Sequence, residues 1–376
     1  MKVAIIINTS WNIYNFRKGL VQSLLDRGDE VIAIAPRDAY SEHIVDWGCE
    51  FIHIEMDGTG MNPLKDIGLL FSIKKKLREC RADIVLSYTI KPNLYASVAS
   101  GLIGIPCICN VSGLGTVFLW TGALKKFAVF LYSFCFRFNK WTFFQNDEDR
   151  EEFLSLIHLD KEKTSLLPGS GINTQVFSFT PNPPTEKTTF LMISRLIVEK
   201  GVREYIEAIR ILKQRTTKTN LQFKLIGGLD ENHARTIQRK ELDEWIEEGL
   251  IEHTEHLSDV RPEIQMAHVI VLPSYREGTP RTLLEGGAMG RALLASDVAG
   301  CRHVLKDGYN GFLFEVRNPV DMANKMDLYL AMNDEERKVM SKNSRARIEE
   351  LFDEKKVIEL YTSKIDDLVA KKLIQS

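Results

Sequence analysis

The fold of this chain can be predicted from one stretch, Val269-Ile270-Val271-Leu272-Pro273-Ser274-Tyr275-Arg276-Glu277-Gly278-Thr279-Pro280-Arg281-Thr282-Leu283-Leu284-Glu285. Its apolar start is typical of a buried strand, and the turn residues that follow interrupt that strand. Gly278 lets the backbone approach a ligand closely, and Pro280 fixes the φ angle of a first helical turn. The stretch therefore predicts a strand, a tight loop and a helix, with Glu277 in the loop and Glu285 on the helix.

Two carboxylates at these positions could bind two polyhydroxyl groups, and the backbone N–H groups between them are suited to oxyanions. This combination is typical of a site for a sugar nucleotide. On spacing alone, two ordinary glutamates on an exposed surface are the more common explanation, by roughly two to one. Features elsewhere in the chain favour the ligand site.

Two upstream segments supply these features. Residues 191–201 predict another strand, loop and helix start, and they offer Arg195 and Lys200 as two fixed cations. Residues 223–228 predict a strand that ends in the paired glycines Gly227 and Gly228. Cations and close backbone approach are both suited to a diphosphate.

With these motifs in place, the chain resembles the retaining GT-B-fold glycosyltransferases of family 4. The family motif of a Glu, seven residues and a second Glu matches Glu277 and Glu285, and its diphosphate-binding Arg and Lys match Arg195 and Lys200. The resemblance runs over nearly the whole chain. It is closest to the bacterial members that extend polyprenyl-diphosphate-linked oligosaccharides by one N-acetylhexosamine or hexose.

The resemblance implies an α/β fold of the GT-B type, with two doubly wound Rossmann-like domains facing across a cleft. It also implies that Glu285 binds the ribose of a UDP-sugar, that Glu277 holds sugar hydroxyls, and that Arg195 and Lys200 stabilise the leaving diphosphate. Glu277, Arg195 and Lys200 are therefore the expected catalytic residues, and no metal or other cofactor is expected. Further donor-binding residues would be Gly227, Gly228, Gly278, Thr279, Pro280 and Arg281.

Composition is consistent with a folded two-domain enzyme. The chain has 376 residues, of which 44% are hydrophobic and 27% charged, so each of two domains can bury its own core. A net charge of −2 argues against a general nucleic-acid-binding protein. The six cysteines form no Cys-x-x-Cys pair, the N-terminus does not resemble a signal peptide, and no apolar run is long enough to span a bilayer. We therefore expect a cytoplasmic protein with reduced thiols.

Strands and helices are predicted to alternate along the whole chain, which indicates doubly wound parallel sheets. The predicted strands are residues 3–7, 31–35, 51–54, 84–87, 107–111 and 141–145, and then 190–193, 223–226, 269–272 and 292–296. No glycine follows the first strand between Asn8 and Arg17, which excludes the Gly-x-Gly-x-x-Gly of a dinucleotide-binding dehydrogenase.

Domain boundaries follow from a proline-rich polar stretch, residues 178–188, which we interpret as a linker. The predicted domains are residues 1–177 on the acceptor side and 189–355 for the nucleotide sugar. An amphipathic helix is predicted at the C-terminus. In the resembling family, the corresponding helix, here about 356–376, crosses back to the first domain.

Residues 124–141 form a cationic, aromatic-rich segment within a window, residues 84–146, that contains no Asp or Glu. One interpretation is a helix that lies in a membrane interface beside anionic headgroups. The other is a core helix of the first domain with its lysines at a solvated edge. The upstream cations Lys74, Lys75, Lys76 and Arg78 would add to a basic face. We expect a peripheral protein on the inner face of the cytoplasmic membrane, where a polyprenyl-diphosphate-linked acceptor would lie.

Candidate residues on the acceptor side are Asn15, Arg17, Lys91, Gly113 and Gly115. Arg17 could contact an acceptor phosphate or be an ordinary surface residue, and the Gly113 to Gly115 segment could approach a ligand or form a plain turn. Many family members have a histidine near the sugar at the position where this chain has Ile90. The next residue, Lys91, is a candidate to replace that contact with the donor. Residues 9–14 also replace the glycine-rich loop that many relatives have after the first strand.

The acidic triplet at residues 147–149 resembles a metal-binding Asp-x-Asp. It follows a predicted strand, so we interpret Asn146 as an N-cap and the acids as partners of the helix dipole. His253 and His256 are interpreted as surface residues, because no cysteine or carboxylate pattern accompanies them.

Two alternatives remain at this point. A GT-B-fold sugar-nucleotide epimerase would turn over a donor without any acceptor. A nucleotide-sugar-binding protein without catalytic activity would bind a donor and leave it unchanged.

Overall fold

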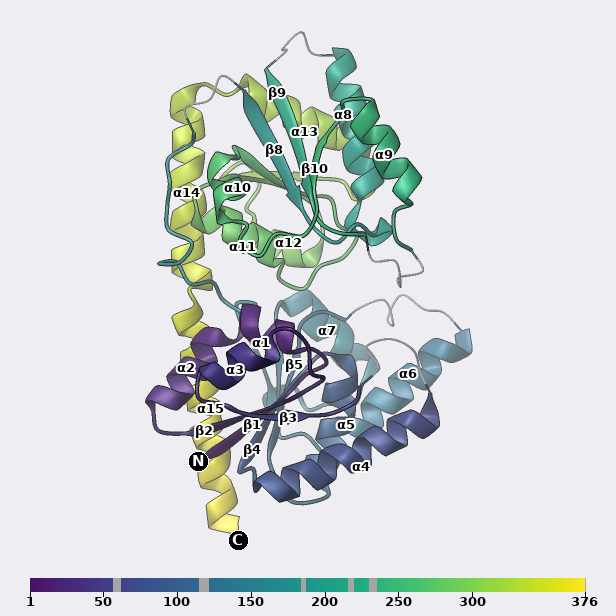
Figure 1. Ribbon diagram of the computed structural model, residues 1–376, viewed down its shortest axis with the longest axis vertical. Helices are drawn as coiled ribbons and strands as arrows, with labels where there is room; N and C mark the ends of the chain where they lie inside the picture. The colour runs from purple at the N-terminus through teal and green to yellow at the C-terminus, as the bar shows by residue number, and fades with distance from the viewer. Residues whose placement is uncertain (57–61, 115–121, 184–186, 216–219, 230–234, 376) are drawn as a thin grey trace. The chain divides into compact units, whose positions relative to one another are not determined.

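The computed structural model describes residues 1–56, 62–114, 122–183, 187–215, 220–229 and 235–375. The chain divides into two compact units (Figure 1). The first comprises Met1–Gly171 and Glu354–Ser376, and the second comprises Ile172–Asp353.

The first unit is built on a seven-stranded sheet with the strand order β3-β2-β1-β4-β5-β6-β7. All of its pairings are parallel, which confirms the doubly wound prediction. The strands are β1 (Lys2–Ile6), β2 (Glu30–Ala35), β3 (Glu50–His53), β4 (Ile84–Tyr88), β5 (Cys107–Val111), β6 (Trp141–Phe144) and β7 (Thr164–Leu166). The order reverses at β1 and β4, so the carboxyl ends of these two strands border the switch point where ligands usually bind in such sheets.

Helices cover both faces of this sheet. One face packs against α1 (Ser10–Phe16), α2 (Lys18–Asp26), α3 (Ser41–Asp46) and α15 (Glu354–Gln375). The other face packs against α4 (Pro63–Cys80), α5 (Ile90–Gly101), α6 (Gly122–Cys135) and α7 (Asp147–Leu156). The Asn146 side chain accepts from the Asp149 N–H at 2.7 Å, so the predicted N-cap of α7 is confirmed.

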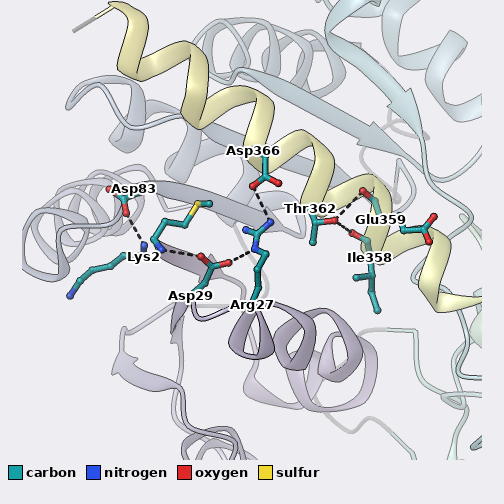
Figure 2. Close-up of polar contacts among 9 residues, drawn as sticks. Lys2, Arg27, Asp29, Asp83, Ile358, Glu359, Thr362 and Asp366 are labelled. Atoms are coloured by element: carbon teal, nitrogen blue, oxygen red, sulfur yellow. Dashed lines mark hydrogen bonds and ion pairs between the residues drawn. The ribbon is translucent and has the colours of Figure 1, made fainter.

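The C-terminal helix α15 belongs to the first unit, where Val357, Tyr361 and Ile365 are buried against the sheet. Ion pairs connect α15 to residues near the N-terminus (Figure 2). Arg27 donates to Asp29 at 2.7 Å and to Asp366 of α15 at 2.9 Å.

The second unit contains a six-stranded parallel sheet with the order β10-β9-β8-β11-β12-β13. Its strands are β8 (Thr188–Ile193), β9 (Leu221–Ile226), β10 (Glu252–Thr254), β11 (Val269–Leu272), β12 (Ala292–Ser296) and β13 (Gly311–Phe314). The strands β8 and β11 are neighbours at the switch point of this sheet. The loops that follow these two strands are the ones singled out from the sequence.

Helices also cover both faces of the second sheet. One core includes side chains of α8 (Val202–Arg215), α9 (Arg239–Glu247) and α13 (Pro319–Ala331). The other includes side chains of α10 (Arg261–Met266), α11 (Arg281–Ala288), α12 (Ala299–Val304) and the C-terminal half of α14 (Asp334–Phe352). None of the helices in the described ranges has the length and apolar character needed to cross a bilayer.

Two predicted boundaries differ from the structure. The chain passes between the units at Gly171 and Ile172, before the predicted linker at residues 178–188. The first residues of that stretch belong to the second unit, because the buried Arg291 side chain donates to the carbonyl groups of Thr180 and Pro181. In addition, α6 ends at Cys135, whereas residues 124–141 were predicted as one continuous segment.

Candidate active site at the carboxyl edge of the second sheet

The loops after β8, β9 and β11 meet at one edge of the second sheet, because parallel strands place their carboxyl ends side by side. This edge contains every residue that the sequence analysis assigned to the donor. The loops that carry these residues are held together by close backbone approaches at glycines and by hydrogen bonds between the loops.

Lys200 lies in a short 3-10 turn, Val198–Lys200, and Gly201 ends this turn with a φ of 71°. A Cβ atom on Gly201 would lie 2.8 Å from the Pro273 carbonyl carbon, so only glycine allows the two backbones to approach this closely. The Tyr275 N–H also donates to the Glu199 carbonyl at 2.9 Å. The turn carrying Lys200 is therefore fixed against the loop that follows β11.

The same loop brings Glu277 to Lys200. The Lys200 ammonium donates to Glu277 Oε1 at 2.5 Å, and the two side chains are 23% and 13% exposed. Arg195 lies nearby in sequence, exposed in the loop after β8. Two of the three predicted catalytic residues are thus in direct contact, and the contact leaves part of each side chain accessible to a ligand.

Glu285 lies one helical turn into α11 and accepts from Arg281 Nε at 3.0 Å. Burial raises the pKa of the Glu285 carboxyl, and the positive charge of Arg281 opposes this shift. The start of α11 is anchored to the end of β8, because the Thr282 hydroxyl donates to the Ile193 carbonyl at 3.3 Å. A half-buried carboxylate held in one orientation is suited to accept hydrogen bonds from ligand hydroxyls.

Pro280 occupies the N-cap position of α11, with φ −72° and ψ 119°, and Arg281 is the first helical residue. Pro280 was predicted to lie in the first helical turn, and it lies one residue before the helix. The extended ψ angle at Pro280 ends the loop that contains Gly278 and Thr279. Gly278 is buried and Thr279 is partly exposed in this loop.

Gly300 was not identified from the sequence, although it fixes the position of this loop. It lies in the first turn of α12, and a Cβ atom there would be 2.5 Å from the Glu277 carbonyl oxygen and 2.6 Å from the Gly278 carbonyl carbon. The second residue of α12, Gly300, must therefore be glycine if the loop after β11 is to keep its path. The only signal in the sequence is a glycine inside a helical pattern, which sequence analysis usually treats as tolerated rather than required.

The two glycines after β9 differ from each other. A Cβ atom on Gly227 would lie 2.9 Å from the Ser194 carbonyl carbon, so Gly227 allows the ends of β8 and β9 to approach. The Gly227 carbonyl is also 2.9 Å from His253 Nε2. Around Gly228, by contrast, there is open space. Gly228 is therefore the glycine of this pair that leaves room for a bound group.

Candidates on the first unit follow the carboxyl ends of β1, β4 and β5. Asn15 is near the end of α1 and donates to the Trp11 carbonyl at 2.9 Å. Arg17 follows α1 and is 6% exposed, with its guanidinium carbon 4.3 Å from the centre of the Tyr88 ring. Arg17 is therefore a buried residue between α1 and α2, and the interpretation of Arg17 as an ordinary surface residue is wrong.

Lys91 lies in the first turn of α5 and donates to the buried Asp66 of α4 at 3.1 Å. This ion pair joins the two helices, and a contact between Lys91 and a donor stays a prediction. Gly113 follows β5 with a φ of 136°. Gly115 falls outside the described residues.

Thr89 is a second residue that the sequence analysis missed. It follows β4 with a φ of 69°, a conformation that is strained for a side chain with a branched Cβ. Its hydroxyl oxygen is buried, with no hydrogen-bond partner among the described residues. Nothing in the sequence distinguishes this threonine from an ordinary helix N-cap.

Among the described residues, no three His, Cys, Asp or Glu side chains are close enough together to hold a metal ion. His253 contacts the backbone at Gly227, and His256 is exposed. Asp149 of the acidic triplet is buried and accepts from Asn146. The acidic triplet therefore has the structural role that was predicted for it, and of the two histidines only His256 is an exposed surface residue.

Comparison with known proteins assigns both units. The family model for the glycosyl transferase 4-like domain matches residues 16–169, and the model for glycosyl transferases group 1 matches residues 173–347. The N,N'-diacetylbacillosaminyl-diphospho-undecaprenol alpha-1,3-N-acetylgalactosaminyltransferase of Campylobacter jejuni is 28% identical, and the match covers 98% of this chain and 99% of that protein. The UDP-Gal:alpha-D-GlcNAc-diphosphoundecaprenol alpha-1,3-galactosyltransferase of Escherichia coli is 24% identical, over 82% and 81% of the two chains.

Solved structures show the same fold. A glycosyltransferase from Rickettsia africae has a TM-score of 0.78 at 18% identity, covering 100% of this chain and 99% of that one. HepE of Anabaena in complex with UDP and glucose has a TM-score of 0.77 at 16% identity, covering 100% of both chains. Nothing in these comparisons favours the epimerase alternative. From the two domain models, the full-length similarity and the fold, we conclude that this chain belongs to the family 4 glycosyltransferases with the GT-B fold.

Proposed function

We propose that this glycosyltransferase moves an N-acetylhexosamine or hexose from a UDP-sugar to a polyprenyl-diphosphate-linked saccharide. The observation that carries the proposal is the Lys200–Glu277 contact beside Glu285 at the carboxyl edge of the second sheet. This edge combines cations for a diphosphate with carboxylates for sugar and ribose hydroxyls. The names of the relatives from Campylobacter jejuni and Escherichia coli support this class of acceptor.

The barrier to transfer is dominated by negative charge that develops on the departing diphosphate. Lys200 and Arg195 would stabilise this charge, and backbone N–H groups near Gly278 would assist. Because Lys200 is already fixed by Glu277, its ammonium needs little reorganisation when a donor binds. A cation fixed in advance is worth more to the transition state than one that must be ordered during the reaction.

The two carboxylates would divide the recognition of the donor. Glu285 would accept from the ribose hydroxyls, and Glu277 would accept from hydroxyls of the transferred sugar while it orients Lys200. The sugar would then be held above the diphosphate, so that the acceptor attacks from the side on which the diphosphate leaves. We propose retention of anomeric configuration on this basis, with an α-linked product from an α-linked donor.

We further propose that transfer does not require a metal ion, because protein cations take the role that Mg²⁺ has in many other diphosphate sites. The enzyme would work as a peripheral protein at the cytoplasmic face of the membrane, where its acceptor would be embedded. The aromatic helix α6 would contribute to this attachment, as residues 124–141 predict.

The test is release of UDP from a panel of UDP-sugars, with a short polyprenyl-diphosphate-linked saccharide present or absent. EDTA is included in a parallel series, and the anomeric configuration of the product is read by NMR. Glu277→Gln is the test variant. Glu248→Gln is the matched control, because Glu248 pairs with Arg210 at the C-terminal end of α9, whereas the described edge adjoins the N-terminal ends of α8 and α9.

We expect UDP release that depends on the acceptor, persists in EDTA and gives an α-linked product. Glu277→Gln should reduce it about a hundredfold, while Glu248→Gln stays near the unaltered protein. Conversion of the donor without acceptor would overturn the transferase reaction. Loss of activity in EDTA that Mg²⁺ restores would overturn the metal-independent mechanism, and a β-linked product would overturn retention.

A further inference from the structure

The helix α4 of the first unit exposes a row of large apolar side chains. Leu64, Ile67 and Phe71 are 83%, 55% and 60% exposed. Their spacing of three and four residues places them on one side of the helix. The opposite side carries Leu69 and Ile73, which are buried in the core. The row is therefore a solvent-facing surface of a helix whose other side is already packed.

The helix α6 repeats the same pattern. Phe127, Phe130 and Phe134 are 49%, 66% and 45% exposed and have the same spacing of three and four residues. Tyr132 and Cys135 are buried on the other side of this helix. Large aromatic side chains with this degree of exposure are unusual on a water-facing helix, and here exposed apolar residues form a row on each of two helices instead of standing singly.

The two helices belong to one layer of the first unit. Both contribute to the same core on one face of the sheet, and α5 packs between them (Figure 1). Because the buried sides of α4 and α6 face that sheet, their exposed rows face away from it. We define the exposed apolar surface as the six exposed residues of these rows, Leu64, Ile67, Phe71, Phe127, Phe130 and Phe134.

Positive charge borders this surface. The helical spacing of the α4 row continues into Lys75 and Arg78, which are both exposed. Lys126 is exposed next to the first phenylalanine of α6. The exposed acid of α4, Glu79, lies 3.8 Å from Lys75, and residues 84–146 contain no Asp or Glu at all.

We propose that α4 and α6 together dock onto an anionic lipid surface, with the two apolar rows inserted among the acyl chains and the cations at the headgroups. This proposal deepens the proposed function, because it extends attachment from α6 alone to a two-helix surface that includes α4. Aromatic and aliphatic side chains beside lysine and arginine are the chemistry that an anionic interface selects.

Charge decides between a lipid surface and a second copy of the chain. In a symmetric dimer the same patch meets itself, so the cations of one copy would face the cations of the other. Anionic headgroups would instead neutralise these cations. The charge of the surface is therefore complementary to a membrane and not to itself.

The experiment measures flotation of the full chain with vesicles of phosphatidylcholine containing phosphatidylglycerol, and with vesicles of phosphatidylcholine alone. The test variant combines Phe71→Glu with Phe130→Glu, one change in each row. Leu360→Glu is the matched control, because Leu360 is 40% exposed on α15, which covers the opposite face of the same sheet. Thermal unfolding checks that each variant is folded.

We expect binding to the anionic vesicles that high salt weakens, with at least a tenfold loss, on the order of 1.4 kcal/mol, in the double variant and none in Leu360→Glu. A Phe71→Glu single variant should lose part of the binding, which attributes that part to α4. Equal binding by the double variant would overturn the proposal. So would a dimer in size-exclusion chromatography that the double variant dissociates.

Failure of this proposal is distinguishable from failure of the proposed function. Transfer to a short-chain, water-soluble acceptor should be equal in the unaltered protein and the double variant, because neither phenylalanine belongs to the described active-site edge. Vesicle binding without any transfer would refute the proposed function and leave the docking surface standing. Transfer without vesicle binding would do the reverse.

Discussion

Replacing Gly300 by alanine tests whether the path of the loop after β11 controls catalysis. The substitution adds one methyl group to the first turn of α12. That methyl carbon would lie 2.5 Å from the Glu277 carbonyl oxygen and 2.6 Å from the Gly278 carbonyl carbon. Neither neighbour is the flexible end of a side chain, so the loop or the helix itself must move.

The size of the movement follows from these distances. Real Cβ atoms essentially never lie within 3.0 Å of such neighbours, so the separation must increase by roughly 0.5 Å at the Glu277 carbonyl oxygen and by more at the Gly278 carbonyl oxygen, which lies closer still. Displacements approaching 1 Å in an active site can cost about a hundredfold in rate. We therefore expect Gly300→Ala to lower kcat about tenfold to a hundredfold, equivalent to about 1.4 to 2.7 kcal/mol.

The assay is the initial rate of acceptor-dependent UDP release at saturating donor, measured together with thermal unfolding. Gly68→Ala is the control, because Gly68 lies in a helix with nothing within 4 Å of its added methyl. The control should keep full activity and gain a little stability. A folded Gly300→Ala protein with a turnover within about twofold of the unaltered enzyme would refute the reasoning. Lower stability with unchanged turnover would show that α12 moves and the loop does not.

Three further outcomes can be measured. Lys200→Met should lower turnover about tenfold to a hundredfold with little change in melting temperature, because the partly exposed pair with Glu277 contributes little to folding stability. A large fall in melting temperature would contradict this. Arg291→Met should reduce the free energy of unfolding by about 2 to 5 kcal/mol in denaturant titrations, because the carbonyl groups of Thr180, Ala267 and Met289 would lose hydrogen bonds from a fully buried guanidinium. A change below about 1 kcal/mol would contradict this. Burial and the charge of Arg291 lower the pKa of His268 from 6.5 to about 4 in the folded protein. As the pH falls, the imidazole is therefore protonated in the unfolded chain before it is protonated in the folded one. The protein should lose roughly 3 kcal/mol of stability between pH 6.5 and pH 4. His268→Gln should flatten that pH dependence, and an unchanged slope would assign it to other groups.

The architecture could be predicted from the sequence because its signal is local. Apolar runs such as residues 269–272 alternate with helical patterns at a spacing that is typical of doubly wound parallel sheets. The N-cap at Asn146 was also predictable, because its hydrogen bond spans only three residues. The limits of the units were less accessible. Arg291 holds residues 180 and 181 to the second unit through a contact that spans more than a hundred positions.

The residues of the active-site edge also differ in whether a local pattern in the sequence identifies them. Glu277, Glu285, Arg195 and Lys200 could be identified because their spacing matches a known motif, and the resemblance supplied a role for each one. Gly300 could not, because its requirement arises only when α12 and the loop after β11 are packed together. Glycine requirements of this kind depend on backbone atoms distant in sequence, and no local pattern encodes them.

Backbone packing sets the path of the loops at this edge, and the Lys200–Glu277 contact then fixes the ammonium on them. The Lys200–Glu277 pair is partly exposed, and such pairs contribute only about 0 to 1 kcal/mol to stability. The close approaches at Gly201 and Gly300 are steric, so solvent and salt cannot weaken them. Lys200→Met should consequently remove a charge from a loop that keeps its position, whereas Gly300→Ala should keep every charge and move the loop. If both variants lose turnover but only the methionine variant responds to added amines or salt, the two contributions are separate. Equal responses would mean that the ion pair itself holds the loop in place.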